Sequence, residues 1–305
     1  MRIIFFGTPD FAVASLQALV EAKINVVAVV TAPDKPAGRG QQIQASPVKI
    51  YAESQGLALL QPEKLKNAEF LAELASYQAD LQIIVAFRML PELVWNMPKL
   101  GTFNLHASLL PQYRGAAPIH WAVINGERET GVSTFFLQQE IDTGDLLFQE
   151  TEAISDTDTT GDLYERLMKK GAKLVVKTVW AIEKNETKAK AQEATENLKI
   201  APKLHRETGE IHWSKPGKEI ANLVRGMNPF PAAHTIFQGK NCKVFRVAFY
   251  PEFIPSLGIG IWDTDQKTFL RVGCSDGYLE ILEWQMEGKK RLKIDEFLRG
   301  YSFLF

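Results

Sequence analysis

The sequence predicts an α/β domain with a doubly wound, mostly parallel sheet, followed by a small β-barrel. Three observations support this fold class. Apolar runs alternate with helical patterns in the first half, a polar stretch occupies residues 185–197, and short alternating runs between Gly turns fill the remainder. The 305 residues are too many for one typical hydrophobic core and suit two.

The first predicted strand, Ile3 to Phe6, ends at Gly7, and helical spacing follows from Asp10 to Ala22. Asp10 is the expected N-cap of that helix. Further strands are expected at residues 26–30, 81–86, 102–106 and 132–137, and a helix at residues 160–184. Continuous apolar strands covered by helices are typical of Rossmann-like sheets, which bind ligands outside the carboxyl ends of their strands.

Two long connections, residues 32–46 and 107–117, interrupt this pattern. Long loops in compact domains are usually functional or disordered, so both are candidates for ligand contact.

The second part is expected to be a small, OB-like β-barrel. Its predicted strands are residues 235–237, 243–249, 258–262, 269–272 and 279–284. We therefore expect a first domain at residues 1–184, a linker at 185–203 and the barrel at 204–305.

Charge is distributed unevenly along the chain. The net charge is -1, yet residues 199–246 hold nine Lys or Arg against three Glu, and another basic run spans residues 289–293. A solvated protein surface explains such a stripe, and so does a surface that grips nucleic acid phosphates.

Several classes of protein are disfavoured. Cys242 and Cys274 stand alone, which argues against a disulfide framework or a cysteine zinc site and favours small buried hydrophobes. Pro9 and Ala12 stand where a dinucleotide-binding turn needs glycine. The sequence lacks a secretory leader and any apolar run of membrane-spanning length, so a cytoplasmic protein is expected.

Asn104 and His106 are the most informative pair. They are two residues apart near the carboxyl end of a predicted strand, so their side chains share one face of the sheet. A carboxamide beside an imidazole suits stabilisation of an oxyanion, and the imidazole can also move a proton near neutral pH.

Asp142 is the third candidate. It precedes Thr143 and Gly144 in a tight loop that we expect at the same end of the sheet, after the strand at residues 132–137. Its carboxylate could orient the imidazole or accept a proton from an incoming amine, and the sequence leaves both roles open. Each of these three residues also has an ordinary structural explanation.

These residues lie within a wider pattern. The run from Asn104 to Pro111, the segment from Arg114 to Pro118 and the turn from Asp142 to Gly144 resemble the signature of folate-dependent formyltransferases. Segments 6–11, 33–49 and 228–232 resemble the branch of that family that acts on methionine carried by tRNA. The likeness thus extends from the first residues to near the end of the chain.

The resemblance implies a reaction and a set of catalytic residues. A formyl group would pass from 10-formyltetrahydrofolate, as co-substrate, to the α-amino group of methionine on initiator tRNA, without a covalent enzyme intermediate or a metal. Asn104, His106 and Asp142 would form the catalytic trio, and the chain would act as a monomer.

The resemblance also implies contact residues. The expected folate contacts follow two strands: Phe87, Arg88, Met89 and Leu90, then Ser108, Leu109, Leu110 and Pro111. Phe87 and Arg88 depart from the tyrosine and glycine of relatives, so recognition there is expected through the backbone. The expected tRNA contacts are Lys35, Arg39, Lys203, Arg206, Lys240 and Lys243. Arg114 is either an acceptor contact or a solvent-exposed loop residue.

Three alternatives are kept. Formyl transfer to an amino-sugar nucleotide would use the same trio, but the Arg39 loop and the basic stripe favour tRNA. A degenerate, RNA-holding module is disfavoured by the intact trio. A nicotinamide dehydrogenase is disfavoured by Pro9 and Ala12.

Overall fold

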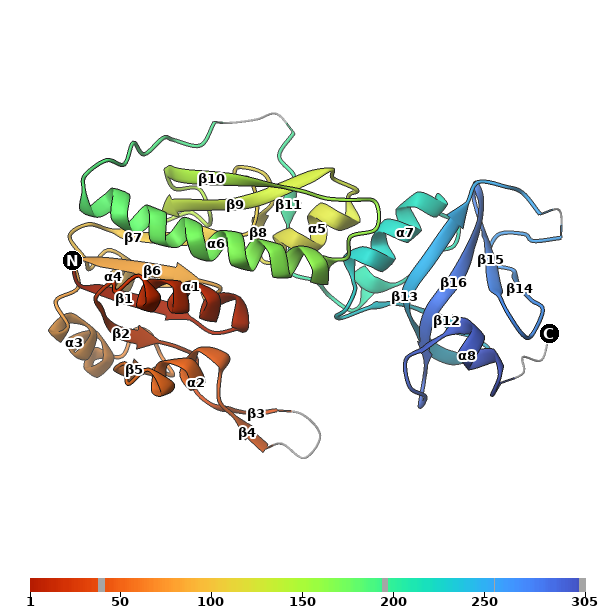
Figure 1. Ribbon diagram of the computed structural model, residues 1–305, viewed down its shortest axis with the longest axis horizontal. Coiled ribbons are helices and arrows are strands. Elements are labelled where there is room, and N and C mark those ends of the chain that lie inside the picture. Colours follow the sequence, from red (N-terminus) through yellow and green to blue (C-terminus); the bar gives the residue numbers. More distant parts are fainter. Residues whose placement is uncertain (38–41, 194–196, 255, 302–305) are drawn as a thin grey trace. The chain divides into compact units, whose positions relative to one another are not determined.

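The computed structural model describes residues 1–37, 42–193, 197–254 and 256–301 (Figure 1). Arg39, with Gly38 and Gly40, lies outside the described residues. The chain forms two compact units, the first made of residues 1–115, 130–152 and 164–200 and the second of residues 116–129, 153–163 and 201–305. The second unit thus includes two segments from the range expected for the first domain, residues 1–184, and the domain boundaries expected at 184 and 204 stay predictions.

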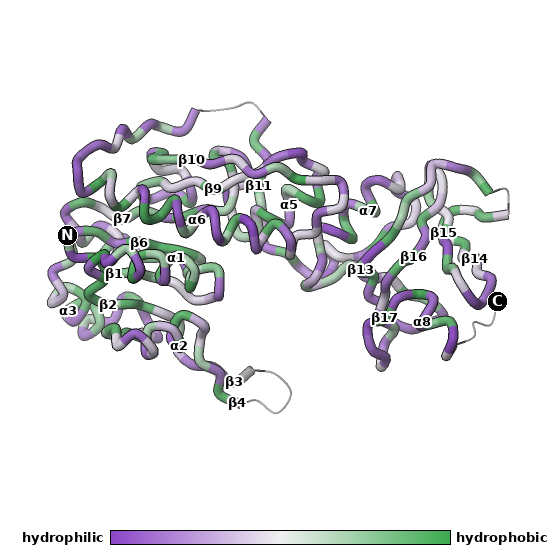
Figure 2. Tube along the Cα trace, viewed as in Figure 1, coloured by the Kyte–Doolittle hydropathy of each residue, from purple (hydrophilic) through white to green (hydrophobic). Residues whose placement is uncertain are grey.

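The first unit is built on a mostly parallel sheet, as the sequence predicts. Its described strands run in the order β10-β9-β7-β6-β1-β2-β5. They are β1 (Ile3–Gly7), β2 (Val26–Val30), β5 (Leu59–Leu60), β6 (Leu81–Val85), β7 (Thr102–His106), β9 (Glu129–Phe136) and β10 (Leu146–Ala153). Strands β5, β2, β1, β6 and β7 are parallel, and β9 is antiparallel to β7. Figure 2 shows the hydrophobic character of β1, β2 and β6, which their burial explains.

Helices cover the sheet, and the packing of one of them identifies the face of β7 from which the site residues project. They are α1 (Asp10–Glu21), α2 (Pro47–Ser54), α3 (Ala68–Ser76), α4 (Glu92–Trp95) and α6 (Thr160–Glu183). α6 packs on β7 at Gly171, where a side chain would lie 2.7 Å from Leu105. Because alternate residues of a strand face opposite sides, Asn104 and His106 project from the face of β7 that does not meet α6.

The expected N-cap of α1 is wrong by one residue. Pro9, with extended φ -80° and ψ 176°, holds that position, and α1 begins at Asp10. Asp10 Oδ1 instead accepts the Phe11 N–H at 3.1 Å and the Tyr164 hydroxyl. The carboxylate still stabilises the positive end of the helix dipole.

The connection at residues 32–46 includes regular structure in its described part, residues 32–37 and 42–46. It contains an antiparallel pair, β3 (Lys35–Ala37) and β4 (Gln42–Gln44). Lys49 Nζ lies 2.5 Å from Asp34 Oδ2 just before the pair, and Gln61 donates to Asp34 Oδ1 at 2.8 Å. Thr31 and Ser46 join their hydroxyls at 2.8 Å, so both ends of the hairpin are fastened to the unit.

The second unit is an antiparallel sheet that curls around its own core. Its described elements are α5 (Pro118–Ile124), a 3₁₀ turn (Glu207–Gly209), α7 (Gly217–Gly226), β12 (Ala233–Phe237), β13 (Lys240–Tyr250), β14 (Trp262–Thr264), β15 (Leu270–Cys274), β16 (Gly277–Met286), β17 (Leu292–Lys293) and α8 (Ile294–Leu298). Strand order is β12-β13-β16-β15-β14, yet the rings of Phe237 on β12 and Trp262 on β14 lie 4.6 Å apart. The two edges therefore meet through side chains, as a barrel-like sheet requires.

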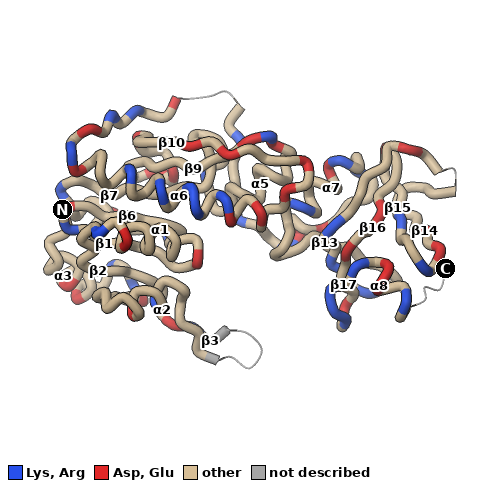
Figure 3. The backbone as a smooth tube through the Cα atoms, viewed as in Figure 1, with Lys and Arg blue, Asp and Glu red and all other residues tan. Residues whose placement is uncertain are grey.

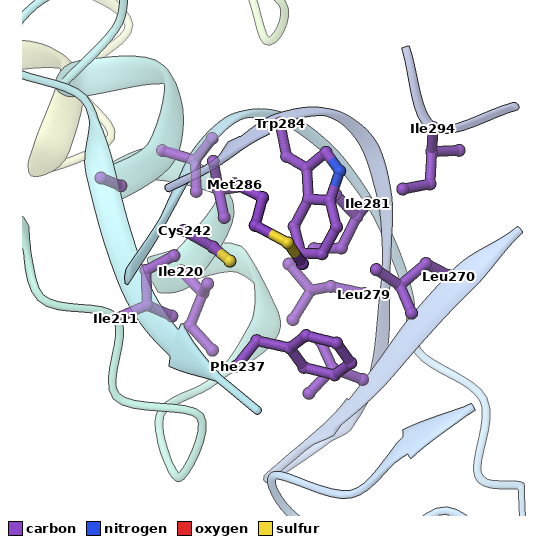
Figure 4. Packing of buried hydrophobic residues seen from close by; sticks show 14 of the residues in the cluster. Ile211, Ile220, Phe237, Cys242, Leu270, Leu279, Ile281, Trp284, Met286 and Ile294 are labelled. Carbon is purple, nitrogen blue, oxygen red and sulfur yellow. The ribbon is translucent and has the colours of Figure 1, made fainter. Parts of the chain in front are cut away.

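Figure 4 shows this core, where Phe237, Leu279 and Trp284 point toward one another. Cys242 and Cys274 are buried and free, which confirms the expectation of small buried hydrophobes. Burial raises the pKa of the Cys242 thiol to about 11.

The strand expected at residues 258–262 is displaced. Residues 258–261 form a turn with a single bridge from Ile259 to Gly273, and β14 begins at Trp262. Gly260 has φ +73°, a left-handed conformation that breaks the extended chain.

Among the described residues, no helix is long and apolar enough to cross a membrane.

Candidate functional site

Strands β6 and β7 bring the two candidate ligand loops to one edge of the sheet. The strands are parallel, and Val85 pairs with Leu105. The connections that follow, residues 86–91 and 107–113, therefore leave the sheet side by side. Ala86 turns the first of them sharply, with φ +47°.

Asn104 and His106 lie on one face of β7, as strand periodicity predicts. His106 is buried, and its Nε2 lies 2.8 Å from the Tyr113 carbonyl oxygen. A carbonyl can only accept, so Nε2 carries the proton and the neutral ring keeps its lone pair on Nδ1. Asn104 is half-buried, and within the described part of the chain no hydrogen bond engages its carboxamide.

Asp142 meets His106 from a different loop. Its Oδ2 lies 3.8 Å from His106 Nδ1, which is beyond hydrogen-bond length. The same oxygen accepts the Gly115 N–H at 2.9 Å. Asp142 has φ +56°, which is uncommon outside glycine and requires support from its surroundings. The structure thus brings His106 and Asp142 together, with Asn104 on the same face of β7.

Asp142 does not reach the site in the way we expected. β9 is antiparallel to β7, so its last residue, Phe136, pairs with Phe103 near the start of β7. The connection of residues 137–145 brings Asp142 back to His106. Gly144 makes this path possible, because a side chain there would lie 1.7 Å from the Phe136 carbonyl oxygen.

The loop after β7 is held by hydrogen bonds within itself and to side chains of β9 and β10. Ser108 is buried and donates from its hydroxyl to Gln112 O at 2.6 Å. The Ser133 hydroxyl donates to Ser108 O at 2.6 Å and accepts the Leu110 N–H at 3.2 Å, while Gln149 donates to Leu110 O at 2.9 Å. Ser108 and Leu110 therefore fix the loop, whereas Leu109 and Pro111 are half-buried.

The loop after β6 combines anchored and exposed residues. The Phe87 ring packs edge-on against Phe6 at 5.7 Å, and Leu90 is buried. Arg88 donates to the carbonyls of Pro62 and Glu63, so its guanidinium is bound to the protein backbone. Met89 is 74% exposed and forms the loop tip.

Three groups of the site have no signal in the sequence: the Tyr113 carbonyl, the Gly115 N–H and Gln192. The Gln192 amide nitrogen donates to Asp142 O and to Gly144 O, each at 2.8 Å. Its oxygen accepts from Arg114 Nε at 3.1 Å and from the same guanidinium at 2.6 Å. Arg114 is thus bound within the site and does not project freely into solvent. Backbone groups carry no sequence signature, and Gln192 falls in the polar stretch predicted to be a linker.

A pocket of about 590 Å³ lies within the second unit. Its lining includes Lys203, Arg206 and Lys243, and among the described residues none of these cations forms an ion pair. Burial lowers the pKa of His234 in the same pocket, and the charges of Arg206 and Lys243 lower it further. The nearby charges of Glu210 and Glu207 oppose this effect. The cations in the lining are thus Lys203, Arg206 and Lys243, and Figure 3 shows Lys and Arg along β13.

Two other expected tRNA contacts lie elsewhere. Lys240, at the start of β13, lies over the Tyr301 ring at 5.7 Å. Lys35 is exposed on β3 of the first unit.

Comparison with known proteins gives consistent matches. Residues 1–179 match the family Formyl transferase, and residues 203–302 match Formyl transferase, C-terminal domain. The methionyl-tRNA formyltransferase of Bacteroides fragilis is 53% identical over 99% of this chain and 95% of its own length. That of Flavobacterium johnsoniae is 47% identical over 99% of this chain and 97% of its own.

Solved structures show the same fold at lower identity. The sugar 3N-formyl transferase WlaRD, crystallised with dTDP and 5-N-formyl-THF, has a TM-score of 0.69 at 22% identity, covering 95% of this chain and 99% of its own. HypX from Aquifex aeolicus, in complex with tetrahydrofolic acid, has a TM-score of 0.65 at 20% identity, covering 98% of this chain and 48% of its own.

Proposed function

Because this chain belongs to the methionyl-tRNA formyltransferase family, we propose that it transfers a formyl group from 10-formyltetrahydrofolate to the α-amino group of methionine on initiator tRNA. The choice of methionyl-tRNA as the acceptor rests on one observation. The chain is 53% identical, along nearly its whole length, to the methionyl-tRNA formyltransferase of Bacteroides fragilis. The observation that supports the chemistry is the cluster of Asn104, His106 and Asp142.

The reaction moves one formyl group and one proton. The neutral amine attacks the formyl carbon, a C–N bond forms, and the carbonyl electron pair moves onto oxygen. The oxyanion then collapses, the bond from carbon to N10 of the folate breaks, and N10 keeps the electron pair. The amine loses a proton and N10 gains one, so the protein must stabilise the oxyanion and manage that proton.

Asn104 and His106 are the proposed oxyanion partners. The Asn104 carboxamide supplies N–H donors. Because Nε2 is committed to Tyr113 O, His106 supplies a further donor at Nδ1 when that atom has taken up the proton released by the amine. Preorganised donors of this kind act where charge develops in the transition state, and removal of one typically costs about 10²–10³-fold in rate.

Asp142 has two proposed roles. Its Oδ2 lies 3.8 Å from Nδ1, so the carboxylate can orient the imidazole. It can also take the amine proton through Oδ1, since Oδ2 accepts the Gly115 N–H. Both roles require Asp142 to stay at its present distance from the ring.

For the folate, we propose contact with the loops after β6 and β7. Phe87 and Met89 from the first and Leu109 and Pro111 from the second offer apolar surface, and the buried Leu90 supports the first loop from below. Ser108, Leu110 and Arg88 hold the loops in shape through hydrogen bonds to the chain itself. The Ala86–Met89 backbone is the proposed source of polar contacts to the pterin ring.

For the tRNA, we propose phosphate contacts from Lys203, Arg206, Lys240 and Lys243, from Lys35 on β3, and from Arg39. Exposed cations suit a backbone that is recognised by its charge. The protein would act as a monomer in the cytoplasm.

An acceptor assay tests the proposal. The protein is incubated with formyl-labelled 10-formyltetrahydrofolate and either methionyl-tRNA or an amino-sugar nucleotide. We expect label on methionyl-tRNA, recovered as formylmethionine after hydrolysis of the ester. Label on the sugar nucleotide alone would show that the acceptor is the sugar and not tRNA. Label on neither acceptor would favour a binding module without transferase activity.

A further inference from the structure

Gln192 lies in the polar stretch that the sequence predicts to be a linker, yet its side chain is bound into the site. Gln192 is half-buried, while its neighbours Ala191 and Glu193 are exposed. Its amide makes two donations and two acceptances, all at 2.6–3.1 Å. These four bonds use both N–H groups and both lone pairs of the amide, so no smaller or singly functional side chain could replace them.

The backbone on both sides of Gln192 is fixed. Lys190 and Leu146 exchange both backbone hydrogen bonds, at 2.8 and 3.0 Å. Further along, Lys199 O accepts the Tyr113 N–H at 2.6 Å, and the Lys199 N–H donates to the Gln112 side chain at 2.8 Å. Lys190 is therefore bound to β10, and Lys199 is bound to the loop that follows His106.

The contacts of Gln192 close a ring around Asp142. Gln192 binds the Asp142 carbonyl and the Arg114 guanidinium, and Gly115, next to Arg114, donates to the Asp142 carboxylate. Two residues before Gly115, the Tyr113 carbonyl accepts from His106 Nε2. The positions of the imidazole and the carboxylate thus depend on one short stretch of chain, residues 113–115, to which Gln192 ties the 137–145 loop.

We propose that Gln192 is a positioning residue for formyl transfer: it sets the distance between the Asp142 carboxylate and His106 Nδ1. This inference rests on the proposed function and goes beyond it, because it assigns a role in catalysis to a segment outside the sheet and its loops. Asp142 has a left-handed backbone, and the hydrogen bonds to its carbonyl and to Gly144 O hold that conformation. Without them, the loop can relax and the carboxylate can leave the ring.

The first test is kinetic and uses the full chain. Gln192→Met keeps the size of the side chain and removes all four bonds, whereas Gln192→Glu keeps an acceptor for Arg114 and loses the two donors. We expect both variants to lower kcat by about 10–100-fold, since displacement of a catalytic group by about 1 Å has effects of this size. KM for either substrate should change less than about threefold. Glu193→Met, at the exposed neighbour, is the matched control and should keep full activity.

A double-mutant cycle separates positioning from a general loss of structure. Asp142→Asn removes the carboxylate, so adding Gln192→Met should lower kcat little further if Gln192 acts through Asp142. Losses that multiply in the double variant would overturn the proposal, as would unchanged kcat in both single variants. Thermal unfolding of each variant identifies any that fails to fold. If Gln192→Met fails to fold, Gln192→Glu takes its place in the double-mutant cycle.

A readout without substrate keeps this inference distinct from the proposed function. In protein labelled with ¹⁵N-histidine, and with His106→Ala for assignment, the His106 Nδ1 resonance should move in Gln192→Met and stay in Glu193→Met. An unmoved resonance contradicts the positioning role whatever the acceptor is. Absence of formyl transfer by the wild-type chain would instead contradict the proposed function.

Discussion

The two units use polar side chains in opposite ways. In the first, His106, Asp142 and Gln192 are held by hydrogen bonds to fixed groups, mostly backbone, at 2.8–2.9 Å. In the second, Lys203, Arg206 and Lys243 line a pocket and, within the described residues, have no acidic partner. The first arrangement fixes geometry, and the second supplies only charge.

This difference predicts different tolerance to substitution. A step that depends on donors aimed at one developing oxyanion is sensitive to displacements of about 1 Å. Binding of a polyanion depends on the sum of nearby charges and falls gradually as single cations are removed. The following predictions test this contrast, beginning with the largest expected effect.

Asn104→Ala and His106→Ala should each lower kcat by at least about 10²–10³-fold, because each removes an oxyanion donor. The measurement is single-turnover formylation of methionyl-tRNA. Asn67→Ala is the matched control: Asn67 caps α3 by accepting the Glu69 N–H at 2.7 Å, so its loss should cost about 1 kcal/mol of stability and leave kcat unchanged. Full activity in either site variant would remove that residue from the mechanism.

Removal of one pocket cation should have a smaller effect. Lys203→Ala, Arg206→Ala and Lys243→Ala are each expected to raise KM for tRNA by about 3–10-fold and to reduce the slope of log affinity against log salt by about 1. Lys218→Ala, at an exposed lysine of α7 outside the pocket, is the control with the same change in net charge. Equal effects at Lys218 would mean that overall charge matters and the pocket does not.

The hairpin of β3 and β4 is an intermediate case, because an ion pair holds it in place. Lys49 anchors it through Asp34 at 2.5 Å. Lys49→Met should lower kcat/KM for methionyl-tRNA by about threefold, since a loosened hairpin loses orientation but keeps its own cations. The control is Lys64→Met at an exposed lysine. A loss confined to kcat, with unchanged tRNA affinity, would assign the hairpin a role in catalysis instead.

The sequence could predict those features that depend on local periodicity. β7 begins and ends where the apolar run predicts, and α6 agrees within one residue at its end. Short elements such as α4 and α8 escaped prediction, because four or five residues carry too little pattern. The strand at 258–262 was misplaced because Gly260 adopts a left-handed turn that composition alone does not reveal.

Long-range contacts limited prediction of the site. Asn104 and His106 could be paired because strand spacing is local. That Asp142 faces His106 was expected, but the expectation that Asp142 directly follows a strand ending at the same edge of the sheet was wrong. β9 is antiparallel to β7, and strand direction depends on the whole sheet. Gln192 lies 50 residues from Asp142 in sequence, and a glutamine in a polar stretch looks like a solvated residue until the fold is known.

The smallest expected effect concerns Glu283, an acidic residue of the second unit that is paired with Arg291. Arg291 binds Glu283 with two hydrogen bonds, at 2.7 and 2.8 Å, and lies over the Phe245 ring at 4.0 Å. The hydrogen bond from Arg291 lowers the pKa of the Glu283 carboxyl, against the opposing effect of partial burial. A lowered pKa stabilises the fold above the unfolded-state pKa, and that contribution is lost as pH falls through the folded-state pKa.

Glu283→Gln should therefore lower the midpoint of thermal unfolding by about 1–3 °C at pH 7, and the difference from wild type should vanish once the pH falls below the lowered folded-state pKa of Glu283. Glu252→Gln, at an exposed acid, should leave the midpoint unchanged at both values. Affinity for tRNA should change little, because Arg291 is a structural cation in contrast to those of the pocket. A clear rise in tRNA affinity on releasing Arg291 from Glu283 would instead place it among the tRNA contacts and extend the binding surface to β17.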